Sequence, residues 1–130
     1  MWKGDVLLVR SGQPGTAAIV PESLNGVNAI DILIATPEKS IVHPIYLCNY
    51  FNSAGGKRMA MGAQRGQIQK HLNVGELKVA PIPIPPLPLQ HHFATIVESV
   101  EKQKMQMYAH LTELDALFAS LQARAFNGEL

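Results

Sequence analysis

The sequence predicts an α+β protein, in which a small mixed domain is followed by one long α-helix that needs a helical partner. Short β-prone runs, separated by glycine- and proline-containing turns, fill the first third of the chain. Five prolines fall within residues 81–88, which favours a stiff, extended joint there. Residues 89–127 contain neither glycine nor proline. The predicted organisation is therefore a domain (1–80), a proline-rich joint (81–88) and a long helix (89–127).

Three strands are predicted in the domain. Residues 5–10 form a β-prone run that ends at the Ser11–Gly15 turn sequence, and residues 16–20 form the next run. These two runs are expected to make a hairpin or two adjacent strands. After an Asn-Gly turn, residues 28–35 alternate partly between polar and apolar and predict the third strand.

A helix is predicted to begin at His43-Pro44, because proline fits the first turn of a helix. Its apolar face comprises Ile45, Leu47, Cys48, Phe51 and Ala54. Gly55-Gly56 is expected to stop or break it. Residues 74–78 predict a helical turn, with Asn73 as its cap, and residues 79–84 a proline-interrupted edge strand.

The clearest periodic signal lies in the long helix. Apolar residues recur at alternating spacings of four and three, with one cation, Lys104, in the series; they are Phe93, Val97, Val100, Met107, Leu111, Leu114, Phe118, Leu121 and Ala125. A helix of this length spans about 57 Å, too long to pack only on the small domain. The seam therefore needs a partner, most simply a second such helix; the alternative is a helix folded back on its own domain.

Two interpretations of Lys104 within this seam are open. It sets the register or the choice of partner at some cost in stability. Alternatively, it lies at the edge of the seam with its stem buried and its ammonium in water, which is the reading we favour from the sequence.

Composition limits the class of protein. Apolar residues make up 47% and charged residues 16%, so the chain can bury a core, and no apolar run is long enough to span a membrane. One cysteine, Cys48, cannot form an internal disulfide, and residues 1–5 do not have a signal-peptide layout; both favour the cytoplasm. Residues 41–87 carry five basic side chains and one acidic side chain, which fits either a polyanion-binding surface or an ordinary solvated one.

No catalytic, metal or cofactor constellation is recognisable in the sequence. The histidines lack partners at metal-ligand spacing, so His91-His92 is expected to be a solvated helix turn. Cys48 lies among apolar residues, so a buried inert thiol is favoured over a nucleophile. The glycine pairs do not match a phosphate-binding loop. We therefore expect no enzyme, no metal and no cofactor.

The chain resembles the specificity subunit of type I restriction–modification systems. The resemblance lies in the Pro81–Gln90 segment, in Phe93–Val97 and in the Leu117–Leu130 ending, which contains Ala-Phe-Asn-Gly-Glu-Leu. Upstream, Gly4–Gly12 and Gln67–Asn73 also look similar. Leu89 departs from the glutamate that the family commonly has before Gln90. In this family the recognition domains are usually longer before the strand that here starts near Gly4.

The resemblance implies a non-catalytic subunit that recognises double-stranded DNA and docks methyltransferase and restriction subunits. It implies part of one target recognition domain plus one conserved helix. A full subunit holds two recognition domains and two antiparallel helices, so this chain is expected to form an antiparallel homodimer or to pair with another specificity subunit. The alternative is a fragment that acts only as a helix-mediated dimerisation module without specific DNA binding; a self-contained enzyme is the third possibility and has the least support.

Candidate DNA contacts follow from side-chain chemistry and are not taken from the family motif. Arginine grips guanine and glutamine grips adenine with two hydrogen bonds each, whereas lysine more often meets phosphate. The predicted base contacts are Arg58, Arg65 and Gln67, with Gln64 a weaker choice; the predicted phosphate contacts are Lys57 and Lys70, and Arg10 is a further candidate. For each residue the alternative is a solvated surface side chain.

Overall fold

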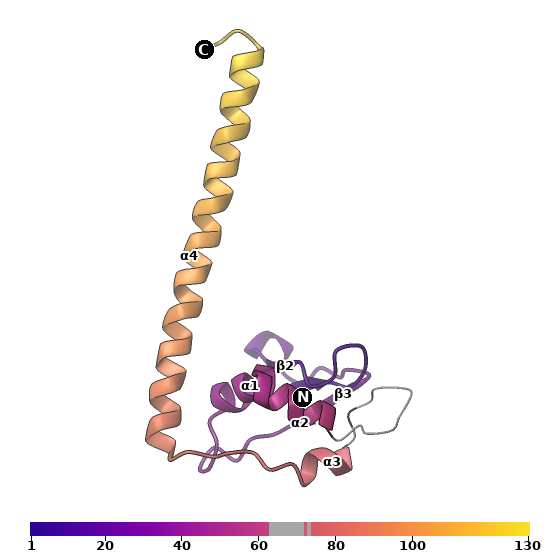
Figure 1. The fold of residues 1–130 in the computed structure, drawn as a ribbon. Helices are drawn as coiled ribbons and strands as arrows, with labels where there is room; N and C mark the ends of the chain where they lie inside the picture. The colour runs from indigo at the N-terminus through magenta and orange to yellow at the C-terminus, as the bar shows by residue number, and fades with distance from the viewer. Residues whose placement is uncertain (63–71, 73) are drawn as a thin grey trace. The chain divides into compact units, whose positions relative to one another are not determined.

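The structure, a computed structural model, describes residues 1–62, 72 and 74–130. It divides into two compact units, Met1–Ala94 and Thr95–Leu130, which are described separately below. The first unit combines a three-stranded sheet with short helices, and the second consists of the rest of the long C-terminal helix α4 and the end of the chain (Figure 1). The predicted α+β class is confirmed.

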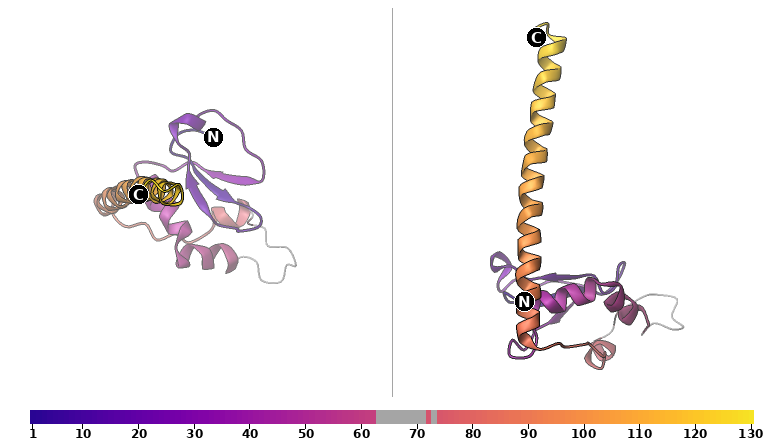
Figure 2. Two further views of the ribbon diagram at one scale, coloured as in Figure 1. Left: turned by 90° about the horizontal axis from the view of Figure 1, so that it is seen from above. Right: turned by 60° about the vertical axis from the view of Figure 1, so that its left-hand side comes forward.

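The sheet is antiparallel, with β1 (Val6–Val9) in the centre between β2 (Ala17–Ile19) and β3 (Ile32–Ala35) (Figure 2). The first two strands form the predicted hairpin, with Val6 opposite Ile19. The third strand is shorter than the predicted residues 28–35. Asp31 has a φ of 60°, and this left-handed conformation cannot continue an extended strand toward residue 28.

Helix α1 (Pro44–Asn52) begins where the sequence predicts. His43 caps it, because its Nδ1 accepts a hydrogen bond from the main-chain N–H of Ile45 at 3.2 Å. Leu47, Cys48 and Phe51 form the buried face, and α1 packs on β1 and β2. Ala54, assigned to this face from the sequence, is instead exposed and belongs to the next helix.

The break predicted at Gly55-Gly56 occurs just before these glycines, at Ser53. Helix α1 ends at Asn52, and both glycines lie in the first turn of α2 (Ala54–Gly62). A Cβ atom on Gly56 would lie 2.1 Å from the Tyr50 carbonyl oxygen and 2.6 Å from the Phe51 Cα. Glycine is therefore used here for a close approach between the two helices and not as a helix stop.

The segment after α2 is partly as predicted. Helix α3 (Val74–Lys78) matches the predicted turn, while its predicted cap, Asn73, lies outside the described residues. The edge strand predicted at residues 79–84 is wrong, because no strand forms there. Prolines in this stretch have no N–H to donate to a neighbouring strand. A side chain holds the segment in place instead, since the Tyr46 hydroxyl donates to the Pro83 carbonyl oxygen at 2.6 Å.

The core of the first unit lies between the sheet and the short helices. The most deeply buried side chains, each at most 1% exposed, are Val6 and Leu8 on β1, Phe51 on α1, Ala60 on α2, and Leu72. Each large apolar side chain buried in this way contributes about 1.5–3 kcal/mol to folding. Strand β1 and the side chains of Phe51, Ala60 and Leu72, far apart in sequence, are thus held in one cluster.

Helix α4 runs from Leu87 to Phe126 and has 40 residues. It starts two residues before the predicted residue 89, so Pro88 lies in its first turn, where a missing N–H is tolerated. Gly128, with a φ of 74°, follows its C-terminus, and the Glu129 N–H donates to the Arg124 carbonyl oxygen at 2.8 Å. The stop predicted at Asn127-Gly128 is confirmed.

Candidate nucleic-acid interface and helix surface

Three of the predicted DNA-contacting residues lie in the described structure. Arg10 follows β1 and is exposed, while Lys57 and Arg58 lie on α2, half-buried and exposed respectively. Within the described part of the chain, none of the three forms an ion pair with a carboxylate. The other candidates lie outside the described residues; they are Gln64, Arg65, Gln67 and Lys70.

Backbone contacts bring the segments that carry these residues to one end of the first unit. The Leu72 N–H donates to the Arg10 carbonyl oxygen at 3.1 Å. Gly15, in the turn after β1, faces α2 so closely that a Cβ on it would lie 2.8 Å from the Ala60 Cβ. The end of β1, helix α2 and Leu72 therefore meet at the same end of the sheet. Arg10 follows β1 and Arg58 lies on α2, both are exposed, and a guanidinium group can grip phosphate or guanine.

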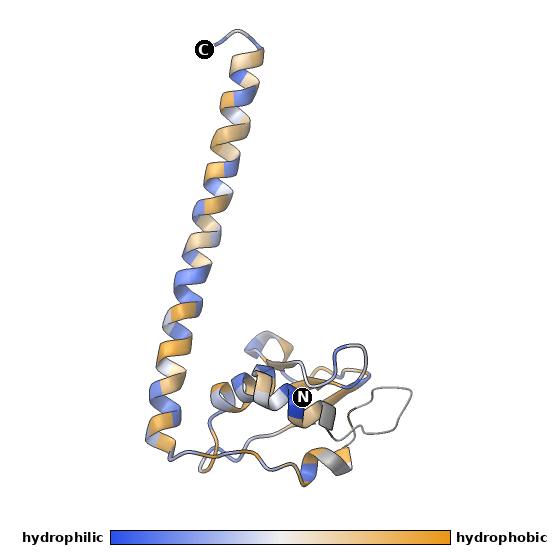
Figure 3. Ribbon diagram, viewed as in Figure 1, coloured by the Kyte–Doolittle hydropathy of each residue, from blue (hydrophilic) through white to orange (hydrophobic). Residues whose placement is uncertain are grey.

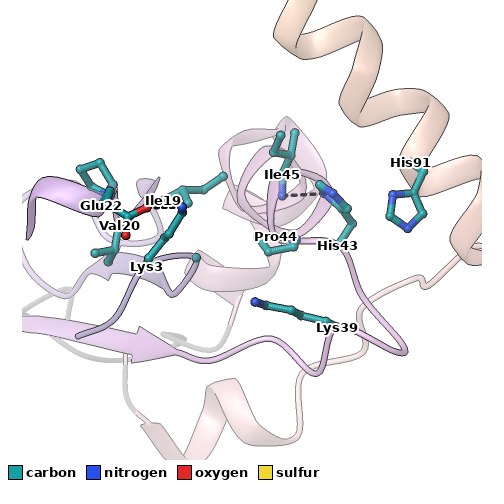
Figure 4. A pocket seen from close by; sticks show the side chains of 11 residues that line it. Lys3, Ile19, Val20, Glu22, Lys39, His43, Pro44, Ile45 and His91 are labelled. Atoms are coloured by element: carbon teal, nitrogen blue, oxygen red, sulfur yellow. Dashed lines mark hydrogen bonds and ion pairs between the residues drawn. The ribbon is translucent and has the colours of Figure 1, made fainter. Parts of the chain in front are cut away.

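A cavity of about 490 Å³ lies at the opposite end of β1 (Figure 4). Its walls are apolar, with Ile19, Val20 and Pro44 among them, and Lys39, His43 and His91 add polar groups at its margin. The rings of His43 and His91 meet edge to face, with centroids 4.9 Å apart. This cavity could not be predicted from the sequence, because its lining comes from separate segments with no common spacing. Lys3, also in the lining, forms an ion pair with Glu22.

Gln90 anchors the first turns of α4 at this same end. Its side chain is fully buried and every polar atom of its amide is used. The Oε1 atom accepts from the His43 N–H at 2.8 Å, and the Nε2 atom donates to the Ile41 and Pro85 carbonyl oxygens at 3.0 and 2.7 Å. Phe93, one turn further, meets Tyr46 edge to face at 6.2 Å. Phe93, predicted as an interface residue, thus also contacts its own domain.

The remaining predicted interface residues lie along α4. Val97 is half-buried, and the others have exposed fractions between 41% and 68%; these are Val100, Met107, Leu111, Leu114, Phe118 and Leu121. Apolar and polar residues alternate along the helix (Figure 3). A contiguous run of large apolar side chains in water is typical of a protein-interaction surface. In the second unit, every residue from Glu98 onward is exposed.

Lys104 interrupts the apolar series with a charge. Its Nζ lies 2.8 Å and 3.1 Å from the two carboxylate oxygens of Glu101, one turn earlier. The hydrogen bond to Glu101, together with the charge of that carboxylate, raises the pKa of Lys104 above its usual value. In the single chain the ammonium is therefore in water and paired along its own helix.

Groups suited to catalysis or metal binding are not gathered in the described residues. Cys48 is buried, and this burial raises the pKa of its thiol, which disfavours the reactive thiolate. Within residues 1–62, 72 and 74–130, no three His, Cys, Asp or Glu side chains are placed to hold a metal ion. Over the same residues, no helix combines the length and apolar character needed to cross a bilayer.

Comparison with known proteins agrees with the resemblance seen in the sequence. Residues 1–114 match the family model described as the type I restriction modification DNA specificity domain. The specificity subunit of the type I restriction enzyme EcoBI from Escherichia coli is 30% identical, over 98% of this chain and 28% of that subunit. The chain thus spans little more than a quarter of this relative's length. On the family match and this identity, the chain belongs to the family of type I restriction modification DNA specificity domains.

Proposed function

We propose that this chain is a sequence-specific DNA-recognition module of a type I restriction–modification specificity subunit. The observation that carries the proposal is the family match over residues 1–114, which includes the whole first unit. Arg10 and Arg58 are exposed, and the segments that carry them, the end of β1 and helix α2, come together at one end of that unit. This supports a DNA-contacting role there. Gln64, Arg65, Gln67, Lys57 and Lys70 are proposed to extend this surface.

The long helix is proposed to hold two recognition domains apart. Two copies paired antiparallel through the α4 seam form a two-fold symmetric dimer. Each domain then reads one half-site, and the base pairs between the half-sites are not read. Helix α4, with 40 residues, is about 60 Å long at 1.5 Å per residue, which limits the separation to about 18 base pairs at 3.4 Å per base pair. A longer specificity subunit could take the place of the second copy.

The remaining parts of the proposal concern partners. The subunit is proposed to be non-catalytic and to dock methyltransferase and restriction subunits, which carry out the chemistry. The single buried cysteine is compatible with a reducing cytoplasm, which is the proposed location. Neither metal nor cofactor is part of the proposed role of this chain.

A second candidate is a helix-mediated dimerisation module that does not bind specific DNA. The observation that favours it is the row of exposed large apolar side chains along α4. In that case the exposed seam of α4 would be the functional surface, and Arg10 and Arg58 would be ordinary solvated side chains. The two candidates differ in whether the purified chain selects a DNA sequence.

The test is selection from a randomised DNA pool, followed by affinity measurements over a salt series. The proposal predicts an enriched inverted repeat with an unread centre, since the dimer is two-fold symmetric. It also predicts affinity that falls steeply with salt. Arg58→Ala is expected to weaken binding to the selected site by about 1–3 kcal/mol. Lys39→Ala removes an equal charge at the opposite end of β1 and serves as the control. Failure to enrich any sequence would favour the dimerisation module.

A further inference from the structure

Lys104 places a positive charge in the middle of the apolar seam of α4. It occupies the seam position between Val100 and Met107, and its ammonium is bonded to Glu101. The side chain of Lys104 is 50% exposed in the single chain, and pairing with another helix would cover part of it. Covering a charge is costly unless the partner offers a compensating group. The position of such a group limits how a partner helix can lie.

The direction of pairing is the first consequence. The seam has two interleaved sets of positions, and Lys104 belongs to the set that also holds Val97, Leu111 and Phe118. In a parallel pair each seam residue faces its own equivalent, so two Lys104 ammonium groups would meet. In an antiparallel pair the two sets face one another, and each Lys104 faces an apolar residue of the other set. Like-charge repulsion therefore disfavours the parallel arrangement.

The register is the second consequence. The antiparallel register that pairs every seam position from Phe93 to Ala125 has its two-fold axis midway between Met107 and Leu111. Its layers pair Val97 with Leu121, Val100 with Phe118, Lys104 with Leu114 and Met107 with Leu111. Asp115 of the second copy follows Leu114 and lies on the flank that Lys104 and Glu101 share. A shift by one layer puts Lys104 opposite Met107 or Leu121, which are followed by the uncharged residues Tyr108 and Gln122.

We propose that Lys104 sets the direction and register of pairing with a second copy of this chain, by lying between Glu101 of its own helix and Asp115 of the second copy. In this register Glu101 and the second copy's Asp115 are neighbours, and without a cation between them two carboxylates would repel. The arrangement occurs twice in the dimer because of the two-fold symmetry. This inference rests on the homodimer proposed above, and charge complementarity is what selects a second copy as the occupant.

The inference is tested on the full chain by reversing one charge in each of two variants and then mixing the two variants. Lys104→Glu and Asp115→Lys, each alone, place like charges together at both sites of the dimer. Each variant is expected to raise the dimer dissociation constant about tenfold or more in sedimentation equilibrium. An equimolar mixture restores one native pair and one swapped pair in a heterodimer, so its affinity is expected to return to within about threefold of wild type.

Matched controls change the same charges on the outward face of the same helix. Lys102→Glu and Glu113→Lys are expected to keep the wild-type dissociation constant, alone and when mixed. A wild-type dimer whose charge-reversed variants do not prefer one another would overturn the register inference and leave the homodimer standing. A wild-type chain that stays monomeric, or that pairs only with a different helix, would overturn the homodimer as well.

Discussion

At the residue scale, Gln90 shows how one polar side chain fixes the start of the long helix. A neutral amide buried without water is tolerated because its acceptor and both donors are used by the main chain of His43, Ile41 and Pro85. These partners lie 47, 49 and 5 residues away in sequence. Gln90 therefore ties the proline-rich joint and the segment before α1 to the first turns of α4.

Gln90→Glu is expected to lower the free energy of unfolding by about 2–4 kcal/mol. The substitution keeps the size of the side chain but removes the donor, and it leaves the carbonyl oxygens of Ile41 and Pro85 facing a carboxylate. Urea unfolding checks this value. Gln106→Glu, an exposed position on the same helix, should change stability by less than about 0.5 kcal/mol. Equal stability of the two variants would show that the Gln90 hydrogen bonds do not hold the joint.

Individual site residues could be predicted from the sequence only by their chemistry. Cys48 is buried in line with its apolar neighbours in the sequence, and Arg10 and Arg58 are exposed as a DNA-binding role requires. The partnership of Gln90 with His43 could not be predicted, because hydrogen bonds across 47 residues leave no local pattern. The same reason explains why the cavity beside His43 and His91 was missed.

At the element scale, local patterns predicted most of the secondary structure. The β1–β2 hairpin, helix α1 and the long helix α4 follow from turn residues, a first-turn proline and heptad spacing. The errors arose where tertiary contacts decide. Residues 79–84 have strand-like composition, but Pro81 and Pro83 have no N–H to donate to a neighbouring strand. Gly55-Gly56 resembles a stop but permits a close approach of α1 and α2.

The two adjacent glycines of α2 give opposite predictions. Gly56→Ala places a Cβ 2.1 Å from the Tyr50 carbonyl oxygen, so it is expected to destabilise the first unit by about 3 kcal/mol or more. Gly55→Ala meets only the Ser53 Oγ, at 3.6 Å, and should stabilise by about 0.5–1 kcal/mol because alanine favours a helix. Thermal unfolding of the two variants tests whether α1 and α2 approach closely at Gly56. Equal effects from the two substitutions would contradict this close approach.

At the scale of the whole molecule, the chain joins a folded domain to a helix whose apolar side chains are exposed in the single chain. Within the second unit, every residue from Glu98 onward is exposed. The proposed pairing with a helix from another chain would cover the apolar side chains among them. The DNA sequence that the domain reads could not be predicted from the amino-acid sequence, because base contacts depend on where the side chains lie. Four of the seven candidate DNA-contacting residues lie outside the described residues.

The central claim, that α4 joins two recognition domains, is tested most directly by measuring the mass of the purified chain in solution. Size-exclusion chromatography with light scattering should give twice the chain mass of 14.2 kDa for the wild type. Leu121→Asp places a carboxylate in the seam, opposite the apolar Val97 of the second copy, and should give a monomer, while Ala116→Asp, on the outward face, should remain a dimer. A monomeric wild type, or a Leu121→Asp variant that still dimerises, would contradict the claim.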